Sequence, residues 1–491
     1  MNSAICWRAA IAGITAALCA APASHAAVTI SSAATANMSC VSGVCSPTAA
    51  NAVLNVGDLT SMLAAGSVTV NTGTGSLAAQ VEDITVAATF NWASANALTL
   101  DAYRSVTFTA PVAVNGVAPV SLVTNDGGSD GNLFFTSGGS LSFLGTANDL
   151  TINGRTYRLE SSIATLAAAI SHKPSGYYAL SASYDASHDG TYKTSPVQTK
   201  VKGAINGLGN SISNLTIDGN NPALGLFSYV DKKGSISSLL VTGAKIVVVA
   251  NREAGSSVSA VLAVRNAGTI FNSFASGEID GTIGNHGVLY LGGLVGGNSG
   301  TIFGSASDTI LQSSTGRSPG ATFTGGLVAD NAATIEGSYA TGTTTVGTSG
   351  SISGGLVGEN GGVIQNCYAE GAVSTSHGGG VGGLVGATFT PSVSDAYSTG
   401  APNAGSDSSV GGSIGYDDGQ GGQSSDYWDT TTSGITNLSQ GAGNIANDPG
   451  VTGETTAQLQ AALPSGFDPK IWAESPSINS GLPYLIANPP Q

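Results

Sequence analysis

Charged residues are scarce in this 491-residue chain, because Asp, Glu, Lys and Arg together make up only 9% of it. Soluble helical proteins carry more charge on their outer faces, so the scarcity favours a β-rich protein with a surface of Ser, Thr, Asn and Gly. The 15 Lys and Arg form no basic run, and the net charge is −15. Nucleic acids and anionic membrane surfaces attract basic patches, so neither is an expected partner.

Long apolar runs are also missing: no segment beyond the N-terminus has the roughly 18 uninterrupted apolar residues of a membrane-spanning helix. Residues 1–26 have the features of a secretory signal peptide. Arg8 supplies a positive charge, residues 9–19 form a short apolar stretch, and residues 24–26 (Ser-His-Ala) form a small-x-small cleavage site. The protein is therefore predicted to be secreted or displayed on an outer cell surface.

Cysteine is rare, and two of the five cysteines, Cys6 and Cys19, would leave with the signal peptide. Cys40 and Cys45 lie close together near the mature N-terminus, and in an oxidising compartment they are predicted to form a disulfide. A metal-binding pair is the weaker alternative, because no His or Cys lies nearby. A lipid anchor at Cys19 is a further alternative, supported only by a loose lipobox.

Glycine is abundant, with 70 residues, but hydrophobic residues make up 41% of the chain, which argues against disorder. The glycines belong to a repeat in the second half. Gly-Gly-Leu-Val-Gly or a close variant begins at 292, 325, 354 and 382 and fades at 411. The start-to-start spacings of 33, 29, 28 and 29 residues indicate a repeat architecture with one continuous core.

Several residue types recur at fixed offsets from the first glycine. The predicted structural repeat positions are Gly292, Leu294, Asn298, Ile302, Gly325, Leu327, Asn331, Ile335, Gly354, Leu356, Asn360, Ile364, Gly382 and Leu384. Residues 260–264 (Ala-Val-Leu-Ala-Val) align as a degenerate first copy, and an aromatic residue recurs at offset 14, as in Tyr339 and Tyr368.

This register favours a parallel β-helix, in which successive coils stack about 4.8 Å apart and place equal positions above one another. Leu, Val and Ile would then form interior ladders, and Asn side chains would hydrogen-bond along the stack. Glycines would occupy corners that need a positive φ or a close approach. A four-stranded propeller blade fits less well, because it needs about 40 residues per repeat.

The chain is predicted to have five parts. Residues 1–26 are the signal peptide, and 27–149 form N-terminal β-helix coils with alternating strands at 67–71, 97–101 and 105–109. Residues 150–199 form an insertion with a hairpin around Asn153-Gly154 and a helix over 162–172, capped by Ser161 or Ser162. Residues 200–430 form the repeat β-helix, and 431–491 a C-terminal capping segment.

The repeat resembles the GLUG motif of bacterial surface and secreted proteins, Gly-Gly-Leu-Val-Gly-x-Asn-x-Gly-x-Ile, at 292–302 and 354–364. Residues 206–227 resemble the segment that usually precedes such repeats, and 426–429 with the tail to 485 resemble their closing segment. Residues 90–102 are similar to coils of filamentous haemagglutinin-type adhesins. The resemblance implies an all-β, right-handed parallel β-helix from a Gram-negative-type bacterium, although neither a two-partner-secretion tract nor a terminal barrel is found. Some GLUG repeats belong to metallopeptidases, but no His-Glu-x-x-His occurs here.

No catalytic, cofactor-binding or metal-binding residue is predicted, because each candidate has a favoured structural alternative. The acids Asp417, Asp418, Asp426 and Asp429 could be catalytic, but Asp417-Asp418 is expected to solvate a turn and Asp429 to cap one. The stretch 125–132, with Asp126 and Asp130, could hold Ca²⁺, but an Asx/Gly turn is favoured. The histidines have no metal spacing and are expected on the surface.

Two further features have a structural and a functional interpretation. The aromatic ladder could stack carbohydrate if it points outward, but interior or corner packing is favoured. Cys367 takes the place of a Ser in other copies and is expected to be a small buried residue.

The function favoured by these features is non-catalytic, adhesin-like binding of a host or matrix glycan or protein by a rigid polar face. The alternatives are a polysaccharide-active β-helix enzyme, which needs converging carboxylates in a groove, and a structural component of a biofilm matrix.

Overall fold

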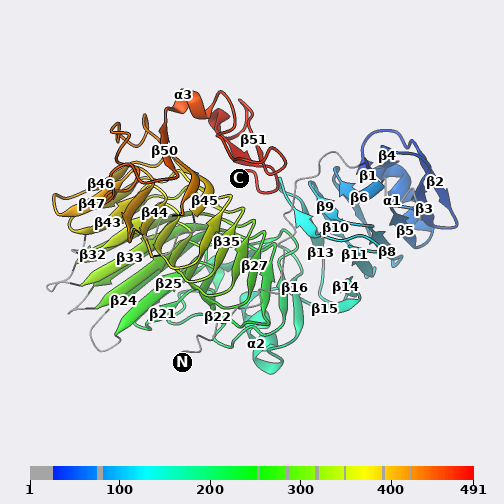
Figure 1. Cartoon of the computed structure of the whole chain (residues 1–491). Coiled ribbons are helices and arrows are strands. Elements are labelled where there is room, and N and C mark those ends of the chain that lie inside the picture. The colour runs from blue at the N-terminus through cyan, green and yellow to red at the C-terminus, as the bar shows by residue number, and fades with distance from the viewer. Residues whose placement is uncertain are drawn as a thin grey trace, which may run out of the picture.

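The computed structural model describes residues 26–73, 81–250, 255–283, 287–315, 320–347, 350–389, 393–419 and 422–490. The predicted signal peptide lies outside these residues except for Ala26. Most strands pair in parallel with the equivalent strand of the next coil, so the chain is a parallel β-helix, as predicted (Figure 1). The described residues contain three α-helices: α1 (Val56–Ala65), α2 (Ile163–His172) and α3 (Thr456–Leu459).

The N-terminal lobe, blue to cyan in Figure 1, stacks coils of three short strands. Interior and exterior residues alternate; in β8, Leu98 and Leu100 are buried, whereas Thr99 and Asp101 are partly exposed. The expected strands are present as β5, β8 and β9. The strands of this lobe are β5 (Val68–Asn71), β6 (Val81–Val86), β7 (Phe90–Trp92), β8 (Leu98–Asp101), β9 (Val106–Phe108), β10 (Pro111–Val114), β11 (Val120–Val123), β12 (Leu133–Phe135), β13 (Ser140–Phe143) and β14 (Leu150–Ile152).

The first coil differs because α1 lies between β4 (Ala52–Asn55) and β5, where other coils have a strand. Asn55 caps this helix by accepting hydrogen bonds from the backbone N–H groups of Gly57 and Asp58. Leu59 and Leu63, one turn apart, are fully buried and close the end of the core. The sequence pattern predicted only strands in this region, so it missed α1.

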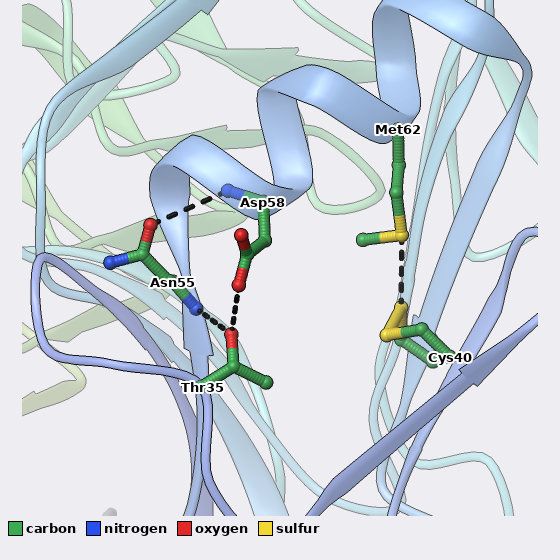
Figure 2. The surroundings of a disulfide bond; sticks show 6 residues. Thr35, Cys40, Asn55, Asp58 and Met62 are labelled. Atoms are coloured by element: carbon green, nitrogen blue, oxygen red, sulfur yellow. Dashed lines mark hydrogen bonds between the residues drawn. A yellow bond between two sulfur atoms is a disulfide. The ribbon is translucent and has the colours of Figure 1, made fainter.

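A hairpin completes this end of the lobe. It consists of β2 (Met38–Val41) and β3 (Val44–Pro47), and it places Cys40 directly opposite Cys45. The structure joins the two by a disulfide, and the thioether sulfur of Met62 lies 3.9 Å from Cys45 Sγ (Figure 2). β3 also pairs with β5, so the disulfide-linked hairpin covers an open sheet edge. β1 (Ala26–Ser31) pairs with β4 and β6.

The segment 150–199 connects the lobes. β14 and β15 (Arg155–Glu160) form the expected antiparallel hairpin around Asn153-Gly154, and α2 begins after its N-cap Ser162. β15 then pairs in parallel with β16 (Tyr177–Leu180), so these strands continue the stack rather than leave it. α2 buries its apolar face against the larger core, and the backbone N–H of Leu141 in β13 donates to the carbonyl of Leu208, which ties the lobes together.

The larger lobe stacks coils on three sheet surfaces. We call these surfaces sheets F, E and D. Sheet F holds β21 (Ala223–Leu224), β25 (Ser256–Ala260), β29 (Val288–Gly292), β33 (Ala321–Gly325), β38 (Ile352–Gly354), β43 (Gly379–Gly382) and β47 (Ser408–Gly411). Sheet E holds β22 (Phe227–Val230), β26 (Ala263–Asn266), β30 (Val295–Asn298), β34 (Val328–Asn331), β39 (Val357–Asn360), β44 (Val385–Thr388) and β48 (Ile414–Asp417).

The third surface, sheet D, carries two strand positions per coil. The first holds β18 (Ala204–Asn206), β23 (Ser235–Ser237), β27 (Thr269–Phe271), β31 (Thr301–Phe303), β35 (Thr334–Glu336) and β40 (Val363–Gln365). The second holds β19 (Ser211–Ser213), β20 (Thr216–Gly219), β24 (Leu240–Ala250), β28 (Phe274–Ile283), β32 (Ala306–Thr315), β36 (Tyr339–Ala340), β37 (Thr344–Val346), β41 (Tyr368–Ala369) and β42 (Val373–Thr375). β45 (Val393–Ser398), β46 (Pro402–Ala404), β49 (Ser424–Asp429) and β50 (Val451–Glu454) complete it.

The repeat positions stack as their spacing predicts. Ile270, Ile302, Ile335 and Ile364 are register partners on successive coils, and the four repeat leucines are fully buried. The asparagines form a continuous ladder: each Nδ2 donates to the Oδ1 of the next at 2.8 Å, through Asn266, Asn298, Asn331 and Asn360. Each Oδ1 also accepts a backbone N–H two residues on, which fixes the corner.

The first repeat glycines are required by a close approach, and their φ angles are not positive. A Cβ on Gly292 would lie 1.8 Å from the carbonyl oxygen of Val295, and one on Gly325 would lie 1.9 Å from that of Val328. Gly354 and Gly382 have the same contact with Val357 and Val385. The sequence offered two reasons for a glycine at this corner, a positive φ and a close approach. The structure shows the close approach.

The C-terminal segment leaves the last coil after β50, forms α3, and then runs back along the outside of the larger lobe as β51 (Trp472–Ala473) and β52 (Tyr484–Leu485), shown in red in Figure 1. Asn488 Nδ2 donates to the carbonyl oxygens of Ser305 and Gly337, near the coils where the lobes meet. The segment therefore covers one outer row of the β-helix over several coils.

Candidate functional site

Sheets E and F of the larger lobe meet at a concave angle on the outside of the coils. Small residues allow this contact: a Cβ on Gly296 of sheet E would lie 2.4 Å from Val258 Cγ1 of sheet F. On the next coils, a Cβ on Gly358 would lie 2.8 Å from the carbonyl oxygen of Thr324, and one on Gly386 would lie 2.8 Å from Ile352 Cγ2. We call this concave angle the E–F corner.

Two rows of outward-facing residues line the E–F corner. Residues two positions before the first repeat glycine form the row on sheet F, and residues five positions after it form the row on sheet E. In register, the sheet F row is Val258, Tyr290, Phe323, Ile352 and Gly380. The sheet E row is Arg265, Gly297, Asp330, Glu359, Ala387 and Tyr416.

The sheet F row is apolar and only partly covered. Tyr290 and Phe323 stack with ring centroids 4.6 Å apart and planes 9° apart, so their faces contact each other and their edges face the corner. Ile352 continues the row, and all three side chains are half-buried. The row therefore offers a partner a strip of ring edges and aliphatic carbon.

The sheet E row brings two carboxylates together. Asp330 and Glu359 are register partners on adjacent strands, and like charges in this arrangement destabilise a sheet. Burial raises the pKa of both carboxyl groups; the neighbouring Asp330 adds to the rise for Glu359, and Arg265 partly offsets it for Asp330. The described residues give neither carboxylate a hydrogen bond or ion pair. The described part of the chain thus leaves two half-buried carboxylates without a protein partner beside an apolar strip.

An opening adjoins these carboxylates. Gly297 lies between Arg265 and Asp330 in the row, and a Cβ there would meet no atom within 4 Å. Burial is the main cause that raises the pKa of Tyr290 on the opposite row; Glu359 and Asp330 add to the rise, and Arg265 partly offsets it. The E–F corner thus combines a cation, two anions, a phenol and an apolar strip around open space.

The acids selected from the sequence lie elsewhere, at the end of the stack. Asp429 caps a turn as expected, because its Oδ1 accepts from the N–H groups of Thr431 and Thr432. The expectation that Asp417 solvates a turn is wrong, since its residue is 2% exposed. Its place in register beyond Thr388 continues the Asn ladder, and Gln423 Nε2 donates to its Oδ2.

Asp426 is fully buried in the same end region, beside Ser413, whose hydroxyl donates to it at 2.7 Å. Burial is the main cause that raises the pKa of Asp426 to about 8, and burial with the nearby Asp417 raises the pKa of Asp448 to about 6. A glycosidase needs carboxyl groups that its substrate can reach, and Asp426 and Asp448 are both buried.

These two groups predict a pH-dependent stability. Both folded-state pKa values lie above the unfolded value near 4, so the stability that these two groups contribute is fully present below about pH 4 and is lost as the pH rises to 8. In Asp426→Asn, the fall measured by thermal denaturation between pH 5 and 8 should be smaller than in the wild type. The exposed change Asp407→Asn should leave the fall unchanged; an equal effect of both variants would contradict this assignment.

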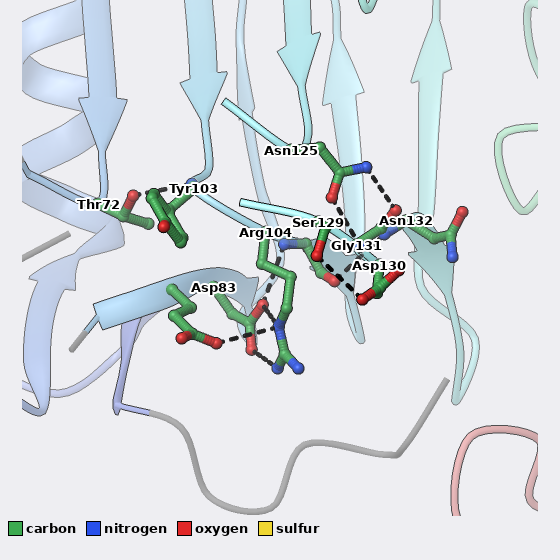
Figure 3. A network of polar contacts seen from close by, with 11 residues as sticks. Thr72, Asp83, Tyr103, Arg104, Asn125, Ser129, Asp130, Gly131 and Asn132 are labelled. Atoms are coloured by element: carbon green, nitrogen blue, oxygen red, sulfur yellow. Dashed lines mark hydrogen bonds and ion pairs between the residues drawn. The ribbon is translucent and has the colours of Figure 1, made fainter. Parts of the chain in front are cut away.

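The proposed calcium stretch forms a turn of hydrogen bonds. Asn125 Oδ1 accepts from the N–H of Gly131, its Nδ2 donates to the Gly131 carbonyl, and Asn125 and Asp130 both have a positive φ (Figure 3). This is the Asx/Gly turn favoured by the sequence. The adjacent Arg104 instead pairs with Asp83 through Nε–Oδ1 at 3.0 Å and Nη2–Oδ2 at 2.5 Å. The described residues contain no group of three or more His, Cys, Asp or Glu arranged to hold a metal ion.

The aromatic ladder lies outside the coil interior but is not open to solvent. Tyr339, Tyr368 and Tyr397 stack with centroids 4.7 and 5.1 Å apart, and Trp472 and Phe467 of the C-terminal segment pack over them. The ladder is buried, so it is packed, as the favoured alternative of interior or corner packing expected, and is not an open carbohydrate platform. The packing partner is the C-terminal segment and not the interior of the coils.

The remaining candidates have structural positions. Cys367 is fully buried at the place of Ser338 in the previous coil, and burial raises the pKa of its thiol to about 12. His172, His188 and His377 are exposed, whereas His25 and His286 lie outside the described residues. In the part of the chain that the structure describes, no helix is long and apolar enough to span a membrane.

Comparison with known proteins adds little to this picture. No protein-family model matches the chain, and no curated protein matches it. Among solved structures, a chain titled "IgA1 Protease" aligns with a TM-score of 0.31 and 17% identity, over 53% of this chain and 24% of that one. This chain thus spans about a quarter of the length of that protein. The class of this protein, a parallel β-helix, follows from its own strand pairing.

Proposed function

We propose that this chain is a secreted or surface-exposed, non-catalytic binding protein of the GLUG-repeat type, and that the E–F corner holds its ligand. The adjacent carboxylates of Asp330 and Glu359, which have no protein partner among the described residues, carry this proposal. Their mutual repulsion costs stability, and a ligand that donates hydrogen bonds would offset that cost. Clusters that break the folding rules in this way are expected at functional sites.

The chemistry of the corner suits a hydroxyl-rich glycan. Sugar hydroxyls donate to the two carboxylates, and the less polar ring carbons lie against Ile352 and the edges of Tyr290 and Phe323. A rigid β-helix holds both rows in place before the ligand arrives, which reduces the entropic cost of binding. The Cys40–Cys45 disulfide is compatible with export, because such bonds persist in oxidising compartments.

The corner predicts the outcome of a paired substitution. In Asp330→Asn with Glu359→Gln, affinity for a bound glycan is expected to fall by about 10–100-fold, because two hydrogen bonds to charged groups, of about 1.5–3 kcal/mol each, are replaced by neutral ones of about 0.5–1.5 kcal/mol each. Thermal stability should be unchanged or higher, because the repulsion is removed. The measurement is binding of the purified protein to an array of neutral glycans and extracellular-matrix proteins, with a melting curve for each variant.

A matched control removes the same charge elsewhere. Glu278→Gln with Asp308→Asn alters two acids on β28 and β32 of sheet D, away from the E–F corner. This variant should bind like the wild type. Equal loss in both variants would make the effect one of net charge, and an array without any ligand would contradict the binding proposal and favour a structural matrix component.

A further inference from the structure

The cations of this acidic chain are concentrated in one region. Lys470 is the only Lys or Arg after residue 317, whereas the short stretch 155–233 contains eight of the 15. They are Arg155, Arg158, Lys173, Lys193, Lys200, Lys202, Lys232 and Lys233. The fold brings three of them, Arg155, Lys202 and Lys233, to the rim of one pocket of about 330 Å³.

The pocket is built where the β14–β15 hairpin meets the first coils of the larger lobe. Tyr157, Tyr177, Ala204 and Ser235 occupy one row on successive strands of sheet D. The row begins with two large aromatic residues and continues with two small ones. The step in size leaves a hollow beside the tyrosines, with Ala204 and Ser235 among its lining residues.

The tyrosines and Arg155 form an ordered wall. The ring centroids of Tyr157 and Tyr177 lie 5.5 Å apart, and the guanidinium carbon of Arg155 lies 5.0 Å from the centre of the Tyr177 ring. Arg155 also donates a hydrogen bond to the Tyr177 hydroxyl. These contacts hold the guanidinium group at the rim without neutralising its charge.

The lysines on the other side of the pocket are also not neutralised. Lys202 and Lys233 each stand two residues before a lining residue of the row, Ala204 and Ser235, so they occupy equivalent places on adjacent coils. Both are exposed. In the described residues no carboxylate lies within ion-pair distance of either lysine or of Arg155, although Asp231 belongs to the same turn as Lys233.

We propose that this pocket binds an anionic sugar unit of a polysaccharide, with a sulfate or carboxylate between Lys202, Lys233 and Arg155 and the sugar ring beside Tyr157 and Tyr177. Three cations on equivalent and neighbouring strands match a group that spreads negative charge over several oxygens. The volume is in the range of small-ligand sites, and the tyrosines provide the amphipathic contact that a sugar ring requires. This site is separate from the E–F corner and does not depend on the function proposed for it.

Dextrans that share one backbone test the proposal. The purified protein should bind dextran sulfate or carboxymethyl-dextran in titration calorimetry and should not bind unmodified dextran or inorganic sulfate with similar affinity. Lys202→Gln with Lys233→Gln should weaken this binding by tenfold or more. Tyr177→Phe keeps the ring but removes the hydroxyl that accepts the hydrogen bond from Arg155. It should weaken the binding less than the two lysine substitutions do.

The control is Lys193→Gln with Lys232→Gln, which removes two positive charges from the same region but from residues that do not line the pocket. It should bind charged dextran within about twofold of the wild type, and so should the Asp330→Asn, Glu359→Gln variant of the E–F corner. Equal weakening by the two lysine pairs, or no binding of either charged dextran by the wild type, would overturn the proposal. Because each site has its own variants and ligands, failure here leaves the E–F corner to be judged by its own result.

Discussion

Replacing Trp472 by alanine is expected to lower the free energy of unfolding by about 3–5 kcal/mol, the usual cost of removing a large buried aromatic side chain. Trp472 is fully buried, and its ring lies 5.9 Å from that of Tyr397 and 4.5 Å from that of Phe467. Its indole N–H donates to Asn366 Oδ1 at 3.1 Å, so the substitution also leaves a buried acceptor unsatisfied.

Unfolding of the Trp472→Ala variant should begin in the C-terminal segment. Tyr397 and Tyr427 donate hydroxyl hydrogen bonds to the carbonyls of Pro483 and Ser465, and these contacts depend on the segment staying in place. Urea denaturation would give the stability, and hydrogen exchange would show early opening of residues 456–490 and exposure of the tyrosine ladder. Phe389→Ala, at a 40% exposed aromatic residue, should cost less than about 0.5 kcal/mol. A similar small cost for Trp472→Ala would show that the segment does not stabilise the β-helix.

Asn331→Ala is expected to cost about 2–4 kcal/mol, because it breaks the asparagine ladder in the middle of the stack. Asn331 is fully buried; it accepts from Asn298, donates to Asn360, and bonds the backbone of Ala333 at both its N–H and its carbonyl. Alanine fulfils none of these roles and leaves buried donors and acceptors on both neighbouring coils.

Denaturation of Asn331→Ala should be compared with that of Asn403→Ala, an exposed asparagine of β46. The exposed change is expected to be nearly neutral. If both variants unfold at the same urea concentration as the wild type, the ladder does not contribute to stability, and the asparagines would serve only to shape the corners.

The repeat period was sufficient to predict the coils, because a fixed spacing places equal offsets in register. Counting from Gly292 identified Asn298 and Ile302 as ladder positions, and both are. The same count from Gly411 reaches Asp417, yet the weakened fifth copy obscured it, and Asp417 was expected in a solvated turn. Its burial follows from residues 440–444, which continue the stack beyond the fifth copy and place Asn444 against Asp417.

Helix α1 was missed although its local signals are present. Asn55 precedes it, Leu59 and Leu63 are spaced by one turn, and Gly66 ends it. Because the surrounding segments alternate with a period of two, a helix of ten residues did not stand out. Its role as an end cap depends on the open end of the first coil, which appears only once the strands are stacked.

The two proposed sites could not be derived from the motif, for a geometric reason. Asp330 and Glu359 each lie five residues after the first glycine of their repeat, so the repeat spacing alone places them side by side on adjacent coils. That this row faces the row of Tyr290 and Phe323 depends on the angle between sheets E and F, which the close contact at Gly296 sets. Likewise, Lys202 and Lys233 meet Arg155 only because the β14–β15 hairpin lies beside the first coils.

Recovering a bound glycan tests most directly whether this protein acts by binding and not by catalysis. A glycan retained on the array would be incubated in solution with the wild type and with Asp330→Asn, then analysed by mass spectrometry and by a reducing-end assay. We expect the glycan to return with its mass unchanged and without new reducing ends. New reducing ends that appear with the wild type and are absent with Asp330→Asn would contradict this, and would make the E–F corner the active site of a polysaccharide-active enzyme.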